Sequence, residues 1–360
     1  MEEYKPPYTI TEKMLNLVSS ISTKLGRIEI YHNLDNKPHL RRNNRIKSVH
    51  SSLKIEANSL TIGQTKDVIN GRMVLGPEQE IQEVKNAYKA YEMIGKVNPY
   101  SLDDLKKVQG IMEYLLKDDA GRFRDGDEGV FNGDTCIFMA PPPQFVPSLM
   151  QDLFGWMSTN RKEVHPLIMG AIFHYEFVFI HPFSDGNGRT ARLLSGYIMD
   201  LNGYGFNGIG SLEEYFAYDI DEYYEAIQMG LPALYYSGRE NPPHPEIWIN
   251  YFLRMVKLYS GKVCDLQLAS EEEDIAGSLS FLKGKEKELL QFLIRNYRGE
   301  FTPIEVSREL SVSNKTVINR LAVLVKNGFA VPVFANQRIR SYELSEFTKD
   351  HQKEIMKEIS

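Results

Sequence analysis

Apolar residues recur every three or four positions along most of this chain, the spacing that places them on one face of an α-helix. In residues 9–25, a threonine cap precedes a stripe made of Met14, Leu15, Val18, Ile21 and Leu25. The same periodicity predicts helices over residues 77–95, 101–116, 143–157 and 165–180. Patterns typical of strands are scarce in this part, so we expect residues 10–262 to form one mostly helical domain.

One short segment departs from the helical pattern. Residues 129–143 read GVFNGDTCIFMAPPP, in which an Asn-Gly pair at 132–133 separates two apolar runs. Asn-Gly favours the tight turn of a β-hairpin. The segment therefore predicts a small hairpin inside the helical domain.

The character of the chain changes near residue 265. An acidic stretch rich in small residues, 264–280, predicts a connecting helix or linker. Beyond it, the pattern predicts three helices and then two strands around a tight connection, over residues 285–296, 302–310, 313–328, 329–334 and 338–344. Helix, helix-turn-helix and hairpin in this order are typical of a winged helix.

The last helix of this predicted winged helix has an apolar face and a polar face. We expect its buried stripe to consist of Val317, Leu321 and Leu324, and its outward face to include Asn314, Lys315 and Asn319. Phosphate contacts are expected from Lys326, Arg338 and Arg340. Residues 281–360 hold 14 Lys and Arg against 10 Asp and Glu, so positive charge gathers where a DNA-binding helix needs it.

Composition places the chain among ordinary globular proteins. It has 360 residues, of which 42% are hydrophobic and 25% are charged, and its net charge of −6 argues against wholesale attraction to nucleic acid or membranes. Its two cysteines, Cys136 and Cys264, lie far apart, which favours a reducing compartment over a disulfide framework. No signal-peptide pattern opens the sequence and no run of eighteen apolar residues occurs. We expect a cytoplasmic protein without a membrane partner.

The stretch HPFSDGNGRTAR, residues 181–192, has far more polar and charged residues than the start of a helix requires. Glycines 186 and 188 leave the backbone N–H groups open at a helix N-terminus, which attracts phosphates. Arg189 and Arg192, three apart on that helix, can reach the same polyanion. Asp185 offers a hard oxygen ligand for Mg²⁺, and His181 can exchange a proton near neutral pH. The combination predicts a nucleotide-phosphate site with a general base.

Other interpretations of the same residues exist. Gly-Asn-Gly alone is usually a turn, a lone histidine is usually structural, and paired arginines usually serve solubility. A zinc site from His174, His181 and Asp185 is conceivable, but arginines that seek phosphate fit zinc poorly beside it. The P-loop and protein-kinase motifs are both absent from the sequence.

The stretch resembles the signature of the Fic family, H-P-F-x-[DE]-G-N-G-R-x-x-R, and matches all nine specified positions. Residues 121–157 are similar to the flap of that family and the helix after it, and DEYYEAI at 221–227 is similar to the segment that lines its nucleotide pocket. The resemblance covers roughly residues 40–260. It implies a mainly α fold, a Fic-type helical bundle with a small β-hairpin flap, followed here by the winged helix-turn-helix domain.

The resemblance also implies an activity, the transfer of AMP from ATP to a Ser, Thr or Tyr hydroxyl of a target protein. In that reaction His181 would deprotonate the hydroxyl and Asp185 would hold Mg²⁺ between the α- and β-phosphates. The phosphates would be held by Gly186, Asn187, Gly188, Arg189 and, at the γ-phosphate, Arg192. Phe183 would pack beneath the loop. A flap over residues 130–140 would hold the target segment by strand addition, and the adenine would lie near Tyr223 and Tyr224.

A second stretch, SSLKIEANSLT at 51–61, is similar to the inhibitory helix of Fic proteins that carry it N-terminal to the catalytic core. The motif positions are Ser52 and Glu56, and the resemblance implies that Glu56 pairs with Arg192 and keeps this arginine from the γ-phosphate. Ala57 stands where family members more often have glycine. In some relatives the same glutamate serves the removal of AMP, so the net direction stays open.

These expectations combine into four regions: residues 1–110 with the inhibitory helix at about 43–60, a catalytic core at 111–262, a linker helix at 263–280 and a winged helix at 281–360. The expected partners are ATP and an unknown target protein with a hydroxyl side chain. For residues 281–360 the choice between DNA and a protein partner stays open, and so does a homodimer. Two alternatives remain. One is a DNA-binding regulator that senses ATP without catalysis, for which the base His181 would be superfluous. The other is a Fic enzyme with a different nucleotide donor or one that removes AMP.

Overall fold

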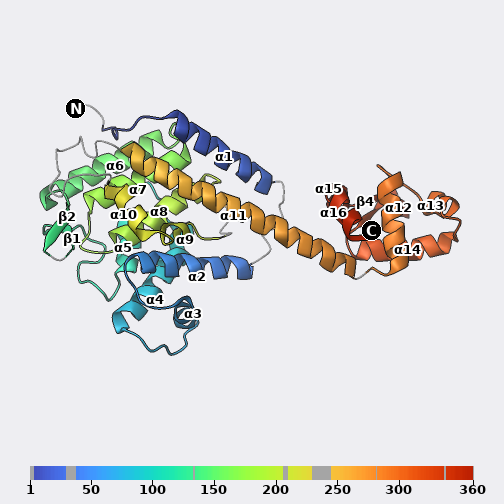
Figure 1. The fold of residues 1–360 in the computed structure, drawn as a ribbon, viewed down its shortest axis with the longest axis horizontal. Helices are drawn as coiled ribbons and strands as arrows, with labels where there is room; N and C mark the ends of the chain where they lie inside the picture. Colours follow the sequence, from blue (N-terminus) through green and yellow to red (C-terminus); the bar gives the residue numbers. More distant parts are fainter. Residues whose placement is uncertain are drawn as a thin grey trace. The chain divides into compact units, whose positions relative to one another are not determined.

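The computed structural model describes residues 4–29, 38–132, 134–205, 210–228, 245–280, 282–335 and 338–359. The chain divides into two compact units, residues 1–264 and residues 265–360 (Figure 1). The long helix α11 (Pro245–Ser280) runs through the boundary. Each unit has a hydrophobic core of its own.

The first unit is almost entirely helical. Its elements are α1 (Glu12–Glu29), α2 (Pro38–Ile55), α3 (Ile62–Ile69), α4 (Glu78–Met93), a 3₁₀ turn (Ile94–Lys96), α5 (Leu102–Met112), β1 (Gly129–Asn132), β2 (Thr135–Met139), a second 3₁₀ turn (Pro143–Phe145), α6 (Val146–Asn160), α7 (Pro166–Ile180), α8 (Asn187–Leu201), α9 (Glu213–Phe216), α10 (Ile220–Gln228) and the first part of α11. Each helix predicted from periodicity in this unit is present. Two details were wrong: Leu15 is 58% exposed instead of buried, and the helix predicted over 101–116 ends at Met112.

Helix α7 lies at the centre of this unit, and all but two of its fifteen residues are buried. Helix α8 packs directly against it. A Cβ added at Gly170 of α7 would lie 3.2 Å from the Ser195 carbonyl oxygen of α8, so glycine is what permits the close approach. The loop between these two helices, residues 181–186, is therefore carried on a rigid base.

The hairpin predicted near residue 130 is present. Strands β1 and β2 pair antiparallel, with Gly129 opposite Met139 and a bulge between Val130 and Phe131. Gly133, the second residue of the expected turn, lies outside the described residues. The aromatic ring of Phe138 reaches back from β2 to the end of α7, where its centroid lies 5.5 Å from that of Phe179.

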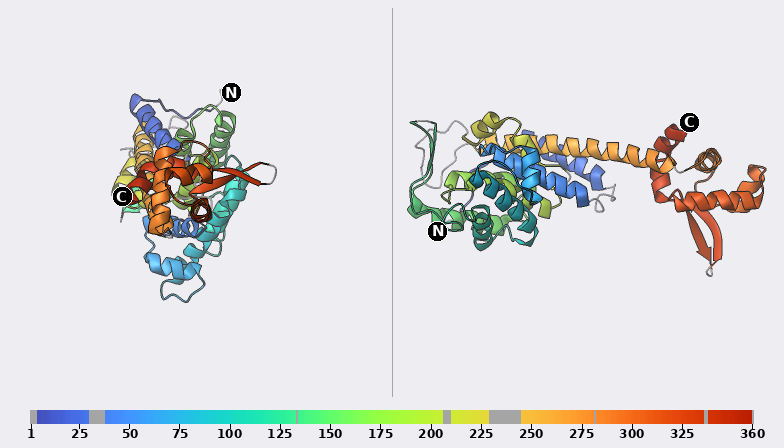
Figure 2. Two further views of the ribbon diagram at one scale, coloured as in Figure 1. Left: turned by 90° about the vertical axis from the view of Figure 1, so that its right-hand side faces the viewer. Right: turned by 90° about the horizontal axis from the view of Figure 1, so that it is seen from below.

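The second unit has the predicted order of elements. They are α12 (Gly284–Asn296), α13 (Pro303–Glu309), α14 (Asn314–Lys326), β3 (Ala330–Ala335) and β4 (Arg338–Leu344), followed by α15 (Glu346–Asp350) and α16 (Gln352–Ile359), two helices that the sequence pattern did not predict. Strands β3 and β4 form a hairpin that projects away from α14 (Figure 2). Residues 336–337 of its expected tight connection, and the Arg338 side chain, lie outside the described part of the chain.

Helix α14 presents the two faces expected of it. Val317, Leu321 and Leu324 are at most 1% exposed, and Asn314, Lys315 and Asn319 are exposed. Leu321 and its neighbours therefore anchor the helix in the core of the second unit and leave its polar face free. None of the described helices in either unit combines the length and the apolar composition that crossing a membrane requires.

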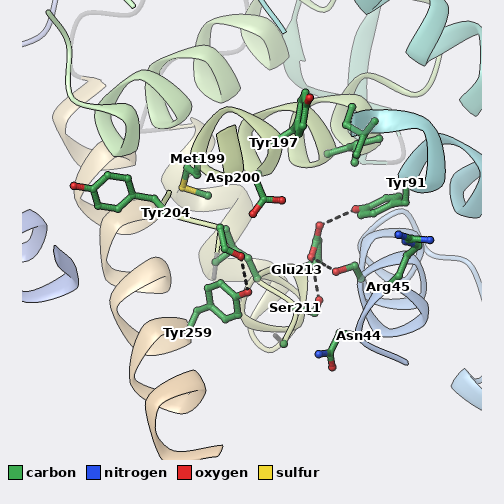
Figure 3. Close-up of a pocket in the computed structure, with 17 residues that line it drawn as sticks. Asn44, Arg45, Tyr91, Tyr197, Met199, Asp200, Tyr204, Ser211, Glu213 and Tyr259 are labelled. Carbon is green, nitrogen blue, oxygen red and sulfur yellow. Dashed lines mark hydrogen bonds between the residues drawn. The ribbon is translucent and has the colours of Figure 1, made fainter. Parts of the chain in front are cut away.

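A buried carboxylate fastens α2 to the rest of the first unit. Glu213, at the start of α9, accepts hydrogen bonds from the hydroxyls of Ser48 (2.7 Å), Tyr91 (2.7 Å) and Ser211 (3.0 Å). These donors come from α2, from α4 and from the segment before α9. They lie beside a cavity of about 370 Å³ (Figure 3). Three hydroxyl donors offset the cost of removing the charge of Glu213 from water, so the carboxylate joins three elements.

We expect Glu213→Ala to lower the free energy of unfolding by about 2–3 kcal/mol, because three hydroxyl groups would lose their shared acceptor. Urea unfolding followed by tryptophan fluorescence measures this, since both tryptophans, Trp156 and Trp248, lie in the first unit. Glu214→Ala is the matched control. That neighbouring carboxylate is 40% exposed and pairs with Lys47 at 3.5 Å, which predicts a loss below about 1 kcal/mol. Equal stability of the two variants would contradict this role for Glu213.

Candidate active site

His181 ends α7 in an unusual backbone conformation. Its φ of 50° and ψ of 59° lie in the left-handed region, which costs a non-glycine residue about 1 kcal/mol or more. Its N–H still bonds to the Phe177 carbonyl oxygen at 3.0 Å, so the residue is both the helix cap and the first residue of the loop. The strain is held by the contacts around it.

The imidazole of His181 is oriented by one hydrogen bond. Its Nδ1 lies 3.2 Å from the Val178 carbonyl oxygen, which can only accept, so Nδ1 carries the proton and Nε2 is left as an acceptor. Enclosure by the protein lowers the pKa of His181, and the positive charge of Arg124 lowers it further. The bond to Val178 and the charges of Glu56 and Asp185 oppose this without cancelling it. The neutral ring can therefore take up a proton at Nε2 near pH 7.

The loop after His181 is braced from inside. The side-chain oxygen of Asn187 accepts from the Phe183 N–H (3.0 Å), and its amide nitrogen donates to the Phe183 carbonyl oxygen (2.8 Å). Asn187 is only 2% exposed. Both ends of the amide therefore hold the loop backbone in this structure, and the contact expected between Asn187 and the phosphates stays a prediction. Phe183 itself is fully buried beneath the loop, as predicted, and packs on Phe123 and Phe177.

Helix α8 begins at this loop, and both glycines of the Gly-Asn-Gly sequence lie against carboxylates there. Gly186 is the N-cap with φ 75°, and a Cβ at this position would also collide with the buried carboxylate of Glu113. A Cβ at Gly188 would collide with the carboxylate of Glu56. Glu56 therefore lies against the N-terminus of α8, the place where the helix dipole and free N–H groups favour an anion.

Arg189 points away from that position and lies between two carboxylates. One of its terminal nitrogens is 2.8 Å from Asp185 Oδ1 and 3.1 Å from Glu113 Oε1. Burial raises the pKa of Asp185, but Arg189, the Gly186 N–H and Lys117 outweigh it and hold that pKa below its usual value. Asp185 is thus an ionised carboxylate, 39% exposed, at the edge of the site.

Arg192 is buried and its guanidinium makes four hydrogen bonds. Two go to Ser52, to the hydroxyl at 3.0 Å and to the carbonyl oxygen at 2.9 Å, one to the Tyr223 hydroxyl at 3.1 Å, and one to Glu56 Oε1 at 2.6 Å. The pairing expected between Glu56 and Arg192 is therefore present. Glu56 follows the last residue of α2, and Ala57 after it has a φ of 62°, the left-handed region in which glycine is less strained.

The two tyrosines expected at the adenine do not share one role. Tyr223 is 1% exposed, and its hydroxyl bonds to His174 Nε2 (3.0 Å) and to Arg192, so its ring offers no open face for a base. The expectation was wrong for Tyr223, which belongs to the core. Tyr224 is 44% exposed and donates to the Ile55 carbonyl oxygen at 3.1 Å, which places it beside the end of α2.

The zinc interpretation was also wrong. Both ring nitrogens of the fully buried His174 have partners, Tyr223 at Nε2 and the Ser195 hydroxyl at Nδ1 (3.3 Å). Burial holds its pKa well below the usual value, so the ring is a neutral member of a hydrogen-bond chain. Within the described ranges, no three His, Cys, Asp or Glu side chains gather as a metal cluster.

Two charged residues at this site were missed from the sequence, Glu113 and Arg124. Glu113 is 1% exposed behind Arg189, and burial raises its pKa to about 7. Arg124 is 5% exposed and bonds to the loop that carries His181. Each stands in a stretch that reads as an ordinary charged helix end or loop, and only the folded contacts distinguish them.

The comparisons with known proteins agree with this geometry. A model of the Fic/DOC family matches residues 99–199. Protein adenylyltransferase Fic of Nematostella vectensis is 29% identical over 170 residues, 43% of this chain and 38% of that protein. Protein adenylyltransferase fic-1 of Caenorhabditis elegans is 30% identical over 210 residues, 52% of this chain and 40% of that protein. The chain thus spans about two fifths of the length of these curated relatives.

Solved structures extend the likeness over nearly the whole chain. A Fic family protein from Desulfovibrio desulfuricans G20 has a TM-score of 0.65 and 30% identity, covering 95% of this chain and 99% of that one. A fragment of Fic-1 from C. elegans has a TM-score of 0.56 and 23% identity, covering 71% of this chain and 73% of that one, which supports the fold alone. The motif, the fold and this full-length likeness lead to one conclusion: the chain belongs to the Fic family.

Proposed function

We propose that the protein is an adenylyltransferase that moves AMP from ATP to a Ser, Thr or Tyr hydroxyl of a target protein. The observation that carries the proposal is the placement of a neutral His181, with Nε2 free to accept, beside the N-terminus of α8 and its arginines. A base next to an anion site is what phosphoryl chemistry on a hydroxyl needs. The curated relatives named protein adenylyltransferases support the same activity.

In this reaction the hydroxyl oxygen of the target attacks the α-phosphorus while its proton passes to His181 Nε2. A bond forms between that oxygen and the α-phosphorus, the bond from the α-phosphorus to the oxygen bridging to the β-phosphate breaks, and pyrophosphate leaves with the electron pair. The Gly186 N–H donates to Asp185 in this structure, so the phosphates would be held by the next N–H groups of α8, including that of Gly188, with Arg189 and Arg192 neutralising charge. Positioning and charge stabilisation supply most of the rate.

Asp185 is the residue that would hold Mg²⁺. It is ionised and partly exposed, and a single carboxylate suits this ion, which usually takes its other ligands from phosphates and water. When bound, Mg²⁺ would neutralise charge on the phosphates. Arg189, which donates to the same carboxylate, would keep Asp185 oriented toward them.

We further propose that the protein is inhibited by Glu56. Its carboxylate lies against Gly188 at the N-terminus of α8 and occupies Arg192, so it takes both the place and the partner of a phosphate. Ser52 and Tyr223 hold the arginine in this arrangement. ATP that binds while Glu56 is in place would lack the Arg192 contact and lie out of line for the attack.

For the second unit we propose contact with DNA through α14. Its exposed Asn314, Lys315 and Asn319, with the exposed Lys326 and Arg340 nearby in sequence, support this. The unit would then bring the enzyme to its targets rather than take part in the chemistry.

Replacing Glu56 with glycine should raise AMP transfer by about 10–100-fold, the value of one charge-assisted hydrogen bond at Arg192. Purified protein is incubated with α-labelled ATP and Mg²⁺, and label on the protein is measured beside intact mass. Glu56→Gln, which keeps the size and loses the charge, should give an intermediate increase. Adding His181→Ala to Glu56→Gly should remove the label while nucleotide binding persists.

Four outcomes would count against the proposal. Unchanged AMP transfer in Glu56→Gly would contradict the inhibitory role of Glu56. AMP transfer that persists after His181→Ala would contradict the role of His181 as the base. Label that disappears from a premodified protein only when Glu56 is present would favour removal of AMP. If every variant binds ATP and none transfers AMP, the result would favour a DNA-binding regulator that senses ATP without catalysis.

The pH dependence follows from the direction of the His181 pKa. The neutral ring is the base, so transfer is lost as the pH falls through the pKa of His181 in the folded protein. That pKa lies below its ordinary 6.5, and Glu56→Gly removes a charge that raises it. We therefore expect the rate of AMP transfer by Glu56→Gly, measured from about pH 5 to pH 8, to fall on the acid side with a midpoint below pH 6.5. A midpoint above pH 6.5 would contradict this environment for His181.

A further inference from the structure

Arg124 stands apart from the other arginines near the site because its hydrogen bonds go to the main chain. It is 5% exposed. Its guanidinium donates to four backbone carbonyl oxygens, those of Gly126 (2.7 Å), Pro141 (2.5 Å), Ile180 (3.4 Å) and His181 (2.7 Å). Its own backbone N–H donates to a fifth, that of Pro182 (3.0 Å). A buried guanidinium used in this way fixes the path of the chain.

Three of these carbonyls belong to the last residue of α7 and the two residues after it. Ile180, His181 and Pro182 are consecutive, and the last carbonyls of a helix have no partner within it. A cation there also interacts favourably with the negative end of the helix dipole. The backbone of His181 is strained, with a φ of 50°, so its conformation needs support from other contacts. Arg124 Nε gives this support, because it donates a hydrogen bond to the His181 carbonyl oxygen at 2.7 Å.

The other two carbonyls flank the hairpin. Gly126 lies three residues before β1 and Pro141 two residues after β2, so one guanidinium ties both bases of the hairpin to the loop of His181. From β2, the ring of Phe138 lies 6.3 Å, centroid to centroid, from the imidazole of His181. The hydrogen bonds of Arg124 therefore connect the hairpin to the segment that carries His181.

We propose that Arg124 is a positioning residue that sets the hairpin and His181 at a fixed spacing, so that a hydroxyl held on the hairpin meets Nε2. This rests on the proposed transfer reaction. Arg124 touches neither the hydroxyl nor the phosphates. Lysine cannot replace it, because one ammonium lacks the planar fork that reaches Gly126, Pro141 and His181 together.

The test compares Arg124→Lys and Arg124→Gln with Arg122→Gln, all in the Glu56→Gly protein. Arg122 is the matched control, exposed and two residues away, with its guanidinium on the Asp118 carbonyl oxygen. We expect kcat for self-labelling to fall about 100-fold in both Arg124 variants, the effect of a displacement of about 1 Å, with the Kd of ATP within about twofold. Arg122→Gln should match its parent. A joint fall of kcat, ATP affinity and Tm in Arg124→Lys would indicate a role in folding alone and overturn the proposal.

Two readouts do not depend on transfer. Amide hydrogen exchange over residues 126–141 should be faster in Arg124→Lys than in Arg122→Gln, with α7 unchanged. By NMR, the pKa of His181 should rise in Arg124→Gln, which loses a positive charge, and hold in Arg124→Lys; Asp185, the other charge acting on it in this background, is present in both. Exchange and pKa values equal to the control would overturn the proposal. An inactive Glu56→Gly parent would instead count against the transfer reaction. The role of Arg124 would then be tested by hydrogen exchange and the pKa of His181 alone.

Discussion

The positive end of helix α8 is the constraint on which the site depends. Its free N–H groups need an anion, and in this structure the carboxylate of Glu56 supplies one while also pairing with Arg192 at 2.6 Å. The same geometry that suits a triphosphate thus suits a side chain of the protein itself. A carboxylate that is already tethered to the chain has a high effective concentration at this place, so no separate anion is needed to fill it.

Glu56 follows a helix whose last turns are fixed in two places. Ser48, Ser52 and Glu56 follow one another at intervals of four residues, and each bonds to the body of the first unit, Ser48 to Glu213 and the other two to Arg192. These contacts hold the C-terminal half of α2, which gives Glu56 a defined position at the end of the row. The turn after α2 includes Ala57 in a left-handed conformation, so a strained backbone position lies next to Glu56.

The sequence predicted those features of the site that are local. The motif at 181–192, the helix starts and ends around it and the hairpin follow from short stretches. The pairing of Glu56 with Arg192, 136 positions apart, follows from the family resemblance alone. What the sequence could not predict are the other contacts across the fold. Arg124 bonds to a carbonyl 57 positions away, and Tyr223 turns inward because His174, 49 positions earlier, needs its hydroxyl. No periodicity within a stretch records such pairs.

A structure of the nucleotide complex would show whether Glu56 and a triphosphate compete for one place at the N-terminus of α8. A crystal structure of Glu56→Gly with a non-hydrolysable ATP analogue and Mg²⁺ should show phosphates at the N-terminus of α8, Arg192 bonded to the γ-phosphate, and the α-phosphorus facing His181 Nε2. A triphosphate bound elsewhere, or an Arg192 that still bonds only to Ser52 and Tyr223, would contradict the account.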